Sequence, residues 1–489
     1  MNGNDSTPLL KKQKVAAHED SQSDAEFDFP EYMTSNVNHS AQQDTLYLDT
    51  IHRPLLDFDF EKVCSVTLSN TNVYCCLVCG KYFSGRSRTS PSYTHSLENN
   101  HHVFINLHNE KYYVLPENYE ITSYSALKSL RDINNFLNPK YTKSDIENLP
   151  VTARDLDHKS YDVGYVGLNN ISANDYSNVV IQALSHIVPI RNWYLSLSHR
   201  QDLNERLESM SPLNYNFGIL VRKLWSKYLY RNHVSPHEFL QYLSSTTKNQ
   251  FSITRQSTPK KLLVWLLNNL HLQLSKSIKK SSTVLSDNLR GRIKVTSMEV
   301  HTKEVNDKVE FETDENSAKE SVSSFWVLTL DLISSPLFMD VTKIQEVALT
   351  KLLQKYDGKQ TSQVSSSELR TYKLIAPLPR YLIFHIDRGL EKDGSTRGNP
   401  TVVQFSTTID MAPYTEGADQ SLNYKLLSTI KRQSTEGVKL DHSDDKNNWA
   451  ISLRRTDDSW VCIKDLEFNA CEGGLLFLEE NYLQIWERC

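Results

Sequence analysis

Hydrophobic and polar positions divide the chain into three stretches of different character. Residues 1–45 are rich in Asp, Ser, Asn and Gln, a composition that buries too little apolar surface to fold. Short apolar runs separated by turn residues fill 46–150, and longer periodic segments fill 160–489. We therefore predict a disordered N-terminal tail over 1–45, a small domain with linker helices over 46–150, and one large domain over 160–489.

Periodicity within the large domain changes from helical to strand-like along the chain. Apolar residues recur at helical spacing in four early segments, 176–187, 216–230, 235–244 and 259–274. Runs rich in β-branched and aromatic residues come later, at Phe325–Leu332, Arg380–Ile386, Thr401–Phe405, Trp449–Arg454 and Trp460–Lys464. Helices followed by strands indicate a segregated α+β fold rather than alternating βαβ units.

The small domain and two polar segments complete this outline. In the small domain we predict strands at 102–107 and 112–115, and helices at 125–136 and 143–149. The segments 275–322 and 432–447 are polar and charged, and they interrupt the large domain. We expect both of them to be exposed insertions or mobile loops.

The composition argues against several classes of function. Among 489 residues, 54 Lys and Arg nearly balance 59 Asp and Glu, for a formal net charge of −5. No domain-wide basic character predicts nucleic-acid binding, and direct contact with RNA stays open, including at Lys431–Lys439. No apolar run approaches the roughly 18–20 residues that a membrane span needs. Lys11-Lys12-Gln13-Lys14 is either a weak nuclear-localisation signal or a run of solvated charges.

Cysteines and histidines cluster between residues 64 and 102. Two residues separate Cys76 from Cys79, so that one tight turn presents both thiolates to the same ion. His95 and His101 follow, and two thiolates with two imidazoles form a closed tetrahedral set suited to structural zinc. Because four protein ligands leave no open position for water, a catalytic metal is not predicted. The alternative ligands in the same stretch are Cys64, Cys75 and His102.

The residues around these ligands form a recognisable motif, Cys76-Leu77-Val78-Cys79-Gly80-Lys81-Tyr82-Phe83, with Gly85-Arg86, His95 and His101-His102 after it. This motif resembles the ubiquitin-protease-type zinc finger. In some members of that family the finger holds the free C-terminal tail of ubiquitin, a function that the resemblance does not imply for this chain. It implies one structural Zn²⁺ and no other cofactor.

A second motif opens the large domain, at Gly167-Leu168-Asn169-Asn170-Ile171-Ser172-Ala173-Asn174-Asp175-Tyr176-Ser177-Asn178. It resembles the cysteine box of the ubiquitin-specific proteases, which reads Gly-Leu-x-Asn-x-Gly-Asn-Thr-Cys-Tyr-x-Asn. Asn170 matches the asparagine that helps to hold the oxyanion in that family. Asp175 stands where the nucleophilic cysteine belongs, and the three residues before it also depart from the pattern.

The chemistry of Asp175 also argues against catalysis. Acyl transfer needs an activated nucleophile, and a carboxylate attacks an amide poorly compared with a thiolate. An oxyanion donor such as Asn170 has no role unless a nucleophile attacks first. Apolar residues recur at helical spacing from Tyr176 onward, so we expect Asp175 to be the N-cap of that helix and to stabilise it.

The general-base position departs from the family as well. The matching box near the C-terminus is Asn447-Asn448-Trp449-Ala450-Ile451-Ser452-Leu453, which places Asn448 where the base histidine belongs. Asparagine has no titratable nitrogen and accepts no proton. Asp465 matches the acid that orients the histidine, with nothing to orient. A shifted alternative would use His442, which lies in a polar stretch before the strand.

Further motifs resemble the splicing branch of this family. They are Leu56–Cys64, Val166–Tyr176, His233–Glu238 and Tyr482–Trp486, beside Leu378–Arg388, which resembles a strand motif of the whole family. The resemblance runs from about residue 46 to the C-terminus and implies a papain-like domain of palm, thumb and fingers. It further implies a nuclear, non-enzymatic scaffold that assembles or stabilises the spliceosomal U4/U6.U5 tri-snRNP, with snRNP proteins as partners.

Two other interpretations stay open. An active cysteine deubiquitinase would need a relocated nucleophile, Cys462 or Cys471, of which Cys462 lies in a predicted strand and suits packing. A receptor for ubiquitin or a ubiquitin-like protein would use the finger or the cleft without cutting a bond.

Overall fold

The computed structural model describes residues 47–305, 308–332, 345–365, 368–390, 399–418, 421–433 and 448–489. The contacts within 47–489 make this stretch one compact unit. The predicted tail over 1–45, His442 and most of the polar segment 432–447 lie outside the described residues.

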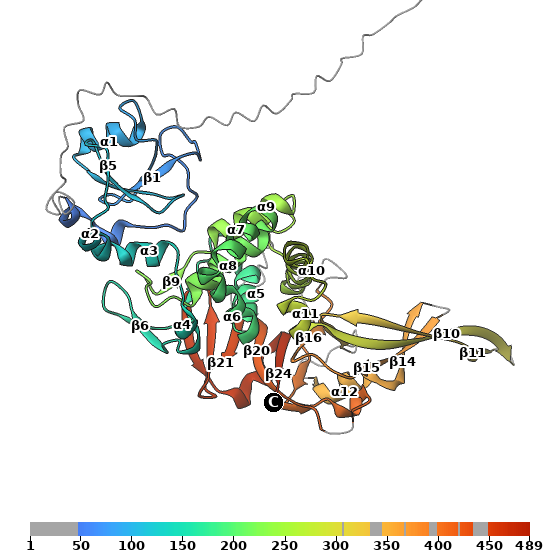
Figure 1. Ribbon diagram of the computed structural model, residues 1–489. Coiled ribbons are helices and arrows are strands. Elements are labelled where there is room, and N and C mark those ends of the chain that lie inside the picture. The colour runs from blue at the N-terminus through green and yellow to red at the C-terminus, as the bar shows by residue number, and fades with distance from the viewer. Residues whose placement is uncertain are drawn as a thin grey trace, which may run out of the picture. The chain divides into compact units, whose positions relative to one another are not determined.

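The N-terminal part of the described chain is an antiparallel sheet with helix α1 beside it (Figure 1), and α1 contacts strand β2. Its five strands have the order β2-β1-β3-β4-β5. The elements are β1 (Val73–Cys76), β2 (Tyr82–Ser84), α1 (Pro91–Asn99), β3 (Val103–Asn106), β4 (Tyr112–Val114) and β5 (Tyr119–Glu120). The two predicted strands are confirmed. Helix α1 was not predicted because its buried residues, Ser92, His95 and Ser96, are all polar.

Three short helices connect this sheet to the large domain: α2 (Tyr124–Ser129), α3 (Arg131–Leu137) and α4 (Lys143–Glu147). The helical character predicted over 125–136 is confirmed, but it belongs to two helices, because the chain bends at Leu130, which ends α2 and precedes α3. Leu130 is buried, and its carbonyl accepts a hydrogen bond from the Tyr112 hydroxyl at 3.0 Å. A hairpin of β6 (Thr152–Arg154) and β7 (Ser160–Asp162) follows α4.

The first half of the large domain is helical, as predicted. Its helices are α5 (Asp175–Ser185), α6 (Val188–Ser196), α7 (Gln201–Met210), α8 (Pro212–Leu224), α9 (His237–Thr246), α10 (Pro259–Ile278) and α11 (Val284–Leu289). The helix predicted over 216–230 ends early, at Leu224, because the Trp225 indole donates to the Ser185 carbonyl at 3.1 Å and turns the chain toward α5. Within the part of the chain that the structure describes, no helix combines the length and apolar character that crossing a membrane requires.

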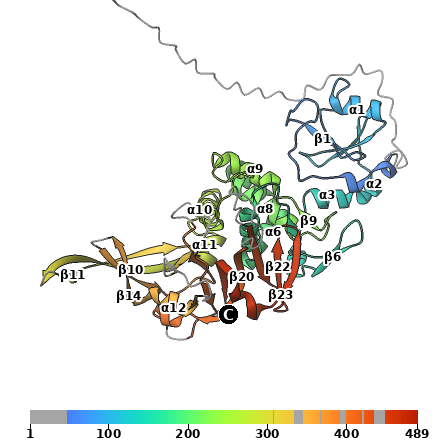
Figure 2. The ribbon, with the colours of Figure 1, turned by 180° about the vertical axis from the view of Figure 1, so that it is seen from behind.

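Strands fill the second half and form two main sheets (Figure 2). The larger sheet has eight strands, in the order β12-β16-β24-β20-β21-β22-β23 with β18 beside β20, and the smaller has the order β11-β10-β15-β14 with β19 beside β15. Their bounds are β10 (Gly291–Val305), β11 (Lys308–Phe325), β12 (Leu328–Asp331), β14 (Asp357–Ser365), β15 (Glu368–Ile375), β16 (Tyr381–Asp387), β18 (Thr408–Asp410), β19 (Thr415–Glu416), β20 (Asn423–Gln433), β21 (Asn448–Arg454), β22 (Trp460–Lys464), β23 (Glu467–Cys471) and β24 (Glu480–Arg488). Helix α12 (Leu349–Leu353) lies between β13 (Glu346–Ala348) and β14, and β13 pairs with β17 (Val402–Gln404).

Of the two alternatives predicted for the polar segment 275–322, an exposed insertion or a mobile loop, the mobile loop is wrong, because the segment has regular structure. It holds the end of α10, all of α11 and most of a long antiparallel ribbon formed by β10 and β11. Backbone hydrogen bonds hold such a ribbon, and both of its faces tolerate polar side chains. Alternation of apolar and polar residues along the ribbon is therefore short. Ile293 is buried at the base of the ribbon, and Val322 is exposed. The predicted strand over Phe325–Leu332 is split between the end of β11 and β12.

The central strands of the larger sheet are buried on both faces, whereas the edge strand β23 is exposed. One face packs against α5, where Val180 and Leu184 share a hydrophobic cluster with Ile451 and Ile463. The other face carries a second cluster that contains Phe384, Leu426 and Trp486. Strands covered on both faces read as nearly continuous apolar runs, which is why β16, β21 and β22 were predictable.

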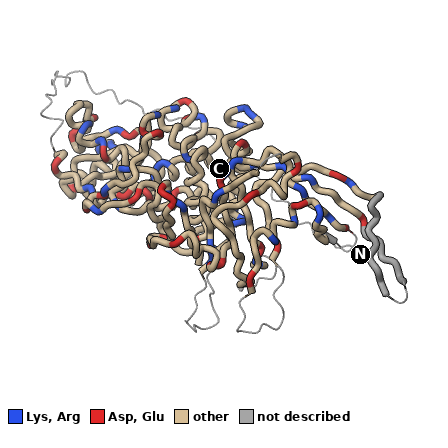
Figure 3. The backbone as a smooth tube through the Cα atoms, turned by 90° about the horizontal axis from the view of Figure 1, so that it is seen from below, with Lys and Arg blue, Asp and Glu red and all other residues tan. Residues whose placement is uncertain are grey.

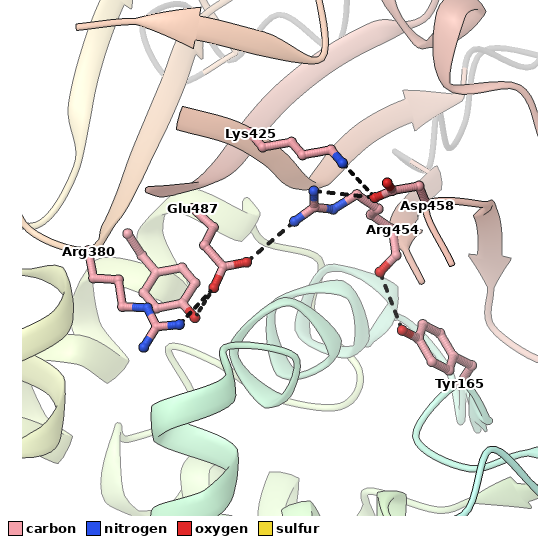
Figure 4. Close-up of polar contacts among 7 residues, drawn as sticks. Tyr165, Arg380, Lys425, Arg454, Asp458 and Glu487 are labelled. Atoms are coloured by element: carbon pink, nitrogen blue, oxygen red, sulfur yellow. Dashed lines mark hydrogen bonds and ion pairs between the residues drawn. The ribbon is translucent and has the colours of Figure 1, made fainter. Parts of the chain in front are cut away.

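An ion-pair network joins three strands at one end of this sheet (Figure 4). Arg454 on β21 lies 3.3 Å from Glu487 on β24, and Lys425 on β20 lies 2.6 Å from Asp458. The Tyr165 hydroxyl donates to the Arg454 carbonyl at 3.3 Å. Tyr165 precedes the Gly167–Asn178 motif by two residues, so this contact fixes the start of the motif against the sheet.

Candidate metal centre and candidate cleft

The structure brings the four predicted zinc ligands together beside the N-terminal sheet of β1 to β5. Cys76 ends β1, Cys79 lies in the following turn, His95 belongs to α1, and His101 comes just after that helix. One donor atom from each residue lies within 4.8 Å of every other.

The two sulfur–nitrogen distances between these donors fit a tetrahedral ion, and the nitrogen–nitrogen distance is slightly short of it. Cys76 Sγ lies 3.6 Å from His101 Nδ1, and Cys79 Sγ lies 3.4 Å from His95 Nε2. The two imidazole nitrogens are 3.1 Å apart. Zn–S bonds of about 2.3 Å and Zn–N bonds of about 2.0–2.1 Å separate tetrahedral donors by roughly 3.3–3.8 Å. Two thiols and two imidazoles at such distances suit zinc and leave no position for water.

Local structure positions these donors. The Asn99 amide nitrogen lies 3.2 Å from His95 Nδ1, and the Phe83 ring stacks on the imidazole at 4.2 Å. Such outer contacts orient a metal-binding histidine. Gly80, directly after Cys79, has a φ of +74°, and a Cβ atom there would meet the Leu55 carbonyl oxygen at 2.3 Å. The turn that presents Cys79 therefore requires glycine.

The three alternative ligands have other surroundings. Cys64 Sγ accepts two backbone N–H groups of its own turn at 3.4 Å. Cys75 is fully buried in the hydrophobic core of the finger, and that burial raises the pKa of its thiol well above the usual value. A ring nitrogen of His102 lies 2.7 Å from the Leu115 carbonyl oxygen.

The candidate cleft lies where α5 begins. Strand β8 (Gly167–Leu168) pairs with β9 (His233–Val234), and the loop after β8 leads to Asp175 at the first position of α5. Asn448 begins β21, and Asp465 lies in the turn between β22 and β23. The structure thus brings segments far apart in the sequence to one end of α5.

Three hydrogen-bond donors hold the Asp175 carboxylate. Oδ2 accepts the Trp449 backbone N–H at 3.0 Å, while Oδ1 accepts the Gln256 amide at 2.8 Å and the Tyr176 N–H at 2.9 Å. Asp175 is only 6% exposed, and burial raises the pKa of its carboxyl although the three hydrogen bonds oppose that rise. The carboxylate therefore connects α5 to β21, next to Asn448.

The predicted N-cap role of Asp175 is wrong. Asp175 is the first helical residue, and Asn174 occupies the N-cap position. The Asn174 side chain bonds within the loop, where it accepts the Ile171 N–H at 2.7 Å and donates to the Asn169 carbonyl at 3.0 Å. Apolar spacing locates a helix start only to within one or two residues, and asparagine is as good a cap as aspartate.

Asn170 and Asp465 bond to each other. The Asn170 amide donates to Asp465 Oδ2 at 3.1 Å, and its own oxygen accepts the Asn174 N–H at 3.3 Å. The Asp465 carbonyl accepts the Leu168 N–H at 3.2 Å. Asn170, predicted to match the oxyanion donor, is therefore hydrogen-bonded to Asp465, predicted to match the acid that orients the histidine.

The two cysteines that a relocated nucleophile would require are poor nucleophiles here. Cys462 is 7% exposed and pairs with Ser452 across β21 and β22, on the sheet face opposite the Ile451 and Ile463 side chains that pack on α5. Burial raises the pKa of the Cys471 thiol, which lowers its thiolate fraction near neutral pH.

Two partners in the cleft were not predicted. The Trp449 backbone N–H carries no signal in the sequence, since every residue but proline has this donor. Gln256 lies in the connection between α9 and α10, where no pattern relates it to Asp175.

Comparison with protein-family models now identifies both parts of the chain. Residues 166–484 match the model of ubiquitin carboxyl-terminal hydrolase, and residues 64–126 match the zinc finger found in ubiquitin hydrolases and other proteins. The first match spans more than half of the chain, which therefore belongs to the ubiquitin carboxyl-terminal hydrolase family. The predicted α+β fold, a zinc finger followed by a ubiquitin-specific-protease domain, is confirmed.

Particular relatives within this family resemble nearly the whole chain. The probable mRNA-splicing protein ubp10 of Schizosaccharomyces pombe is 36% identical over 91% of this chain and 88% of its own length. Ubiquitin carboxyl-terminal hydrolase 39 of Homo sapiens is 37% identical over 90% of this chain and 79% of its own length. The pre-mRNA-splicing factor SAD1 of Saccharomyces cerevisiae is 33% identical over 92% of this chain and 94% of its own length.

Comparison with solved structures agrees with this family assignment. The crystal structure of an essential yeast splicing factor has a TM-score of 0.73 and 30% identity, and the match covers 91% of this chain and 99% of that one. Ubp8, in the SAGA deubiquitinating module bound to ubiquitin aldehyde, has a TM-score of 0.51 at 13% identity, with 92% of this chain and 94% of that one covered. The second likeness shows a shared fold alone.

Proposed function

We propose that this chain is a nuclear, non-enzymatic scaffold in pre-mRNA splicing that assembles or stabilises the U4/U6.U5 tri-snRNP. Relatives named for splicing that match about nine-tenths of the chain support the splicing role. The observation that carries the non-enzymatic part is the Asp175 carboxylate, buried at the nucleophile position and bonded to the backbone beside Asn448. Spliceosomal snRNP proteins are the proposed partners.

The proposed catalytic positions do not support peptide hydrolysis. Asp175 stands for the thiolate, and its lone pairs accept three hydrogen bonds rather than attacking a carbonyl carbon. Asn448 stands for the general base and has no nitrogen that takes up a proton. The Asn170 amide, at the position of the oxyanion donor, is bonded to Asp465. These hydrogen bonds connect the loop before α5, α5 itself and β21, although Asp465 Oδ1 is buried without a partner, so the retained role of the site is structural.

The proposed zinc ligands are Cys76, Cys79, His95 and His101, which would hold one structural Zn²⁺. Two thiolates and two imidazoles complete the tetrahedron without substrate or water. When bound, the ion contributes folding free energy to a finger with a small hydrophobic core.

Contacts between the finger and the helical region suit a rigid scaffold. Lys223 on α8 lies 2.6 Å from Asp59 Oδ1, with only 7% and 15% of the two side chains exposed. Asp59 Oδ2 also accepts the Ser235 N–H at 3.0 Å, and Arg231 lies 3.1 Å from Asp57. A buried, hydrogen-bonded ion pair costs several kcal/mol when one partner is removed, so it holds one arrangement.

Depletion and add-back tests the splicing role. Nuclear extract depleted of this chain should lose intact tri-snRNP, measured by native separation of U4, U5 and U6 RNAs, and the purified wild-type chain should restore it. Asp175→Asn should restore it equally, because no chemistry is required of that position. Intact tri-snRNP after full depletion would contradict the scaffold.

A ubiquitin probe with a C-terminal electrophile tests the non-enzymatic role separately. The wild-type chain should stay unlabelled, since no reactive thiolate lies in the described part of the cleft. Covalent labelling that a substitution at Cys462 or Cys471 removes would establish a relocated nucleophile instead.

A further inference from the structure

A cavity of about 500 Å³ lies between the linker helices and the helical part of the large domain. Residues of α3 and α4 form one side, and residues near Ser198 and Tyr228 form the other. Its volume falls within the roughly 300–1,000 Å³ range of small-molecule sites. None of the four proposed zinc ligands and none of the proposed catalytic positions lines it.

Cations outnumber anions on the walls of this cavity. Arg131, Lys140 and Lys227 line it against one carboxylate, Asp145. Hydrogen bonds from Thr142 already occupy Asp145 and hold the pKa of its carboxyl below the usual value. Figure 3 shows Lys and Arg intermixed with Asp and Glu along the described backbone, so this excess of positive charge is local.

Arg131 is the least compensated of these cations. It is exposed, and its side chain has no ion pair or hydrogen bond to any other described residue. Lys227 lies 3.5 Å from Asp145, and Lys140 lies 3.0 Å from Glu110, outside the cavity. An unpaired guanidinium beside two other cations attracts an anion, and its planar fork suits phosphate.

The same walls supply an aromatic ring and two amides. Tyr228 is half-buried, with Lys227 Nζ 5.3 Å from its ring centroid. The Tyr112 hydroxyl is shared between the Leu130 carbonyl and the Asn134 oxygen, at 2.6 Å from the latter, and the Asn134 amide nitrogen has no hydrogen bond within the described residues. The Asn135 side chain, also half-buried, has no hydrogen bond within the described residues. Ring and amides are the groups that bind base faces and base edges in single-stranded RNA.

We propose that this cavity binds a nucleotide of single-stranded RNA. Arg131 and Lys227 contact phosphate, Tyr228 stacks on the base, and Asn135 hydrogen-bonds to the base edge. A phosphorylated peptide would use the same cations but would need neither the ring nor the amides. This activity goes beyond the proposed scaffold, because contacts to snRNP proteins alone require no RNA site.

Fluorescence anisotropy of a labelled, short single-stranded RNA tests the proposal on the full chain. Arg131→Gln and Lys227→Gln should each weaken binding about three- to tenfold and flatten the dependence of log K on log salt by roughly 0.7 per lost phosphate contact. Tyr228→Leu should weaken binding at least about fivefold with an unchanged salt slope, because stacking involves no counterion release.

Lys143→Gln is the matched control. Lys143 lies on α4 beside the cavity, its side chain is 86% exposed, and it does not line the cavity. This variant should bind RNA like the wild type, and all variants should share its melting temperature.

Three outcomes would overturn the RNA site. Wild-type chain that shows no saturable binding up to about 100 µM has no site of useful affinity. Cavity variants that bind as Lys143→Gln does would place the RNA elsewhere. A phosphoserine peptide that competes for the cavity, with Tyr228→Leu unaffected, would identify a peptide site. Loss of the RNA site with tri-snRNP rescue intact would leave the scaffold role standing.

Discussion

The metal centre of the finger and the cleft of the large domain organise their polar groups in opposite ways. In the finger, four metal-binding groups of two kinds converge until their donor atoms lie within 4.8 Å of one another. In the cleft, hydrogen-bond donors face acceptors of the same chain, with Asp175 bonded to the Trp449 N–H and Asn170 bonded to Asp465.

This difference shows what each site needs from outside the chain. The two thiolates proposed to bind zinc repel each other, and neutral imidazoles offset little of that repulsion, so a cation stabilises the set. Matched donors and acceptors inside a protein are already satisfied, and breaking them costs free energy. The folding of the finger is therefore expected to require a bound cation, and the structure of the cleft is expected to require no ligand.

Removing a proposed zinc ligand should have the largest effect. Cys79→Ser should lose the metal and unfold the finger, since structural zinc contributes roughly 10–16 kcal/mol in finger peptides. Zinc content by mass spectrometry should fall from one ion per chain to none, and hydrogen exchange should accelerate in β1–β4 while β20–β22 stay protected.

Cys64→Ser is the control for this experiment, because Cys64 is bonded within its own turn and serine keeps an acceptor there. It should retain one zinc ion per chain. Full metal content in Cys79→Ser would show that the ligand set is different.

The contrast between the two sites also explains what the sequence could predict. The proposed zinc ligands are visible because Cys76, Cys79, His95 and His101 have few other reasons to share one short stretch. The apolar strands β16, β21 and β22 are visible because both of their faces are buried. The order of helices before strands was sufficient for the fold class.

Other features depend on contacts that leave no local pattern. The β10–β11 ribbon is held by backbone pairing, so its polar side chains resembled a loop. The role of Asp175 depends on a backbone N–H at Trp449, distant in the sequence, and no side-chain pattern encodes that contact. The bend at Leu130 likewise depends on a hydroxyl from β4.

Truncating Asp175 should have the second-largest effect. Asp175→Ala leaves the buried Trp449 and Tyr176 N–H groups without their acceptor, so the free energy of unfolding should fall by about 1–3 kcal/mol in urea titrations. Asn448→Ala, at the half-buried first residue of β21, should cost less than about 0.5 kcal/mol. Equal losses in the two variants would show that the Asp175 hydrogen bonds carry no special weight.

Rebuilding the proposed dyad should have a smaller, kinetic effect. A thiol at position 175 would lie at the N-terminus of α5, and a histidine at position 448 would directly precede Trp449, whose N–H bonds to the side chain at 175 in the wild type. Alkylation of the introduced thiol by iodoacetamide, followed by mass spectrometry, should be about tenfold faster near pH 7 in Asp175→Cys/Asn448→His than in Asp175→Cys alone. Identical pH profiles for the two variants would show that positions 175 and 448 do not face each other.

The pH dependence of Asp175 should be the smallest effect, and its sign decides which force dominates the cleft. Burial raises the pKa of this carboxyl above its usual value, against the opposition of three hydrogen bonds. The folded chain then binds more protons than the unfolded chain in the interval between the two pKa values. The free energy of unfolding therefore falls as pH rises through that interval and is constant above it.

Asp175→Asn lacks the titrating group, so subtracting its stability from that of the wild type isolates this contribution. Urea titrations between about pH 4 and pH 7 should show the difference declining as pH rises. A difference that instead grows with pH would mean that the hydrogen bonds outweigh burial and depress the pKa. In that case the cleft would stabilise an anion, as the finger stabilises a cation, and the contrast between the two sites would disappear.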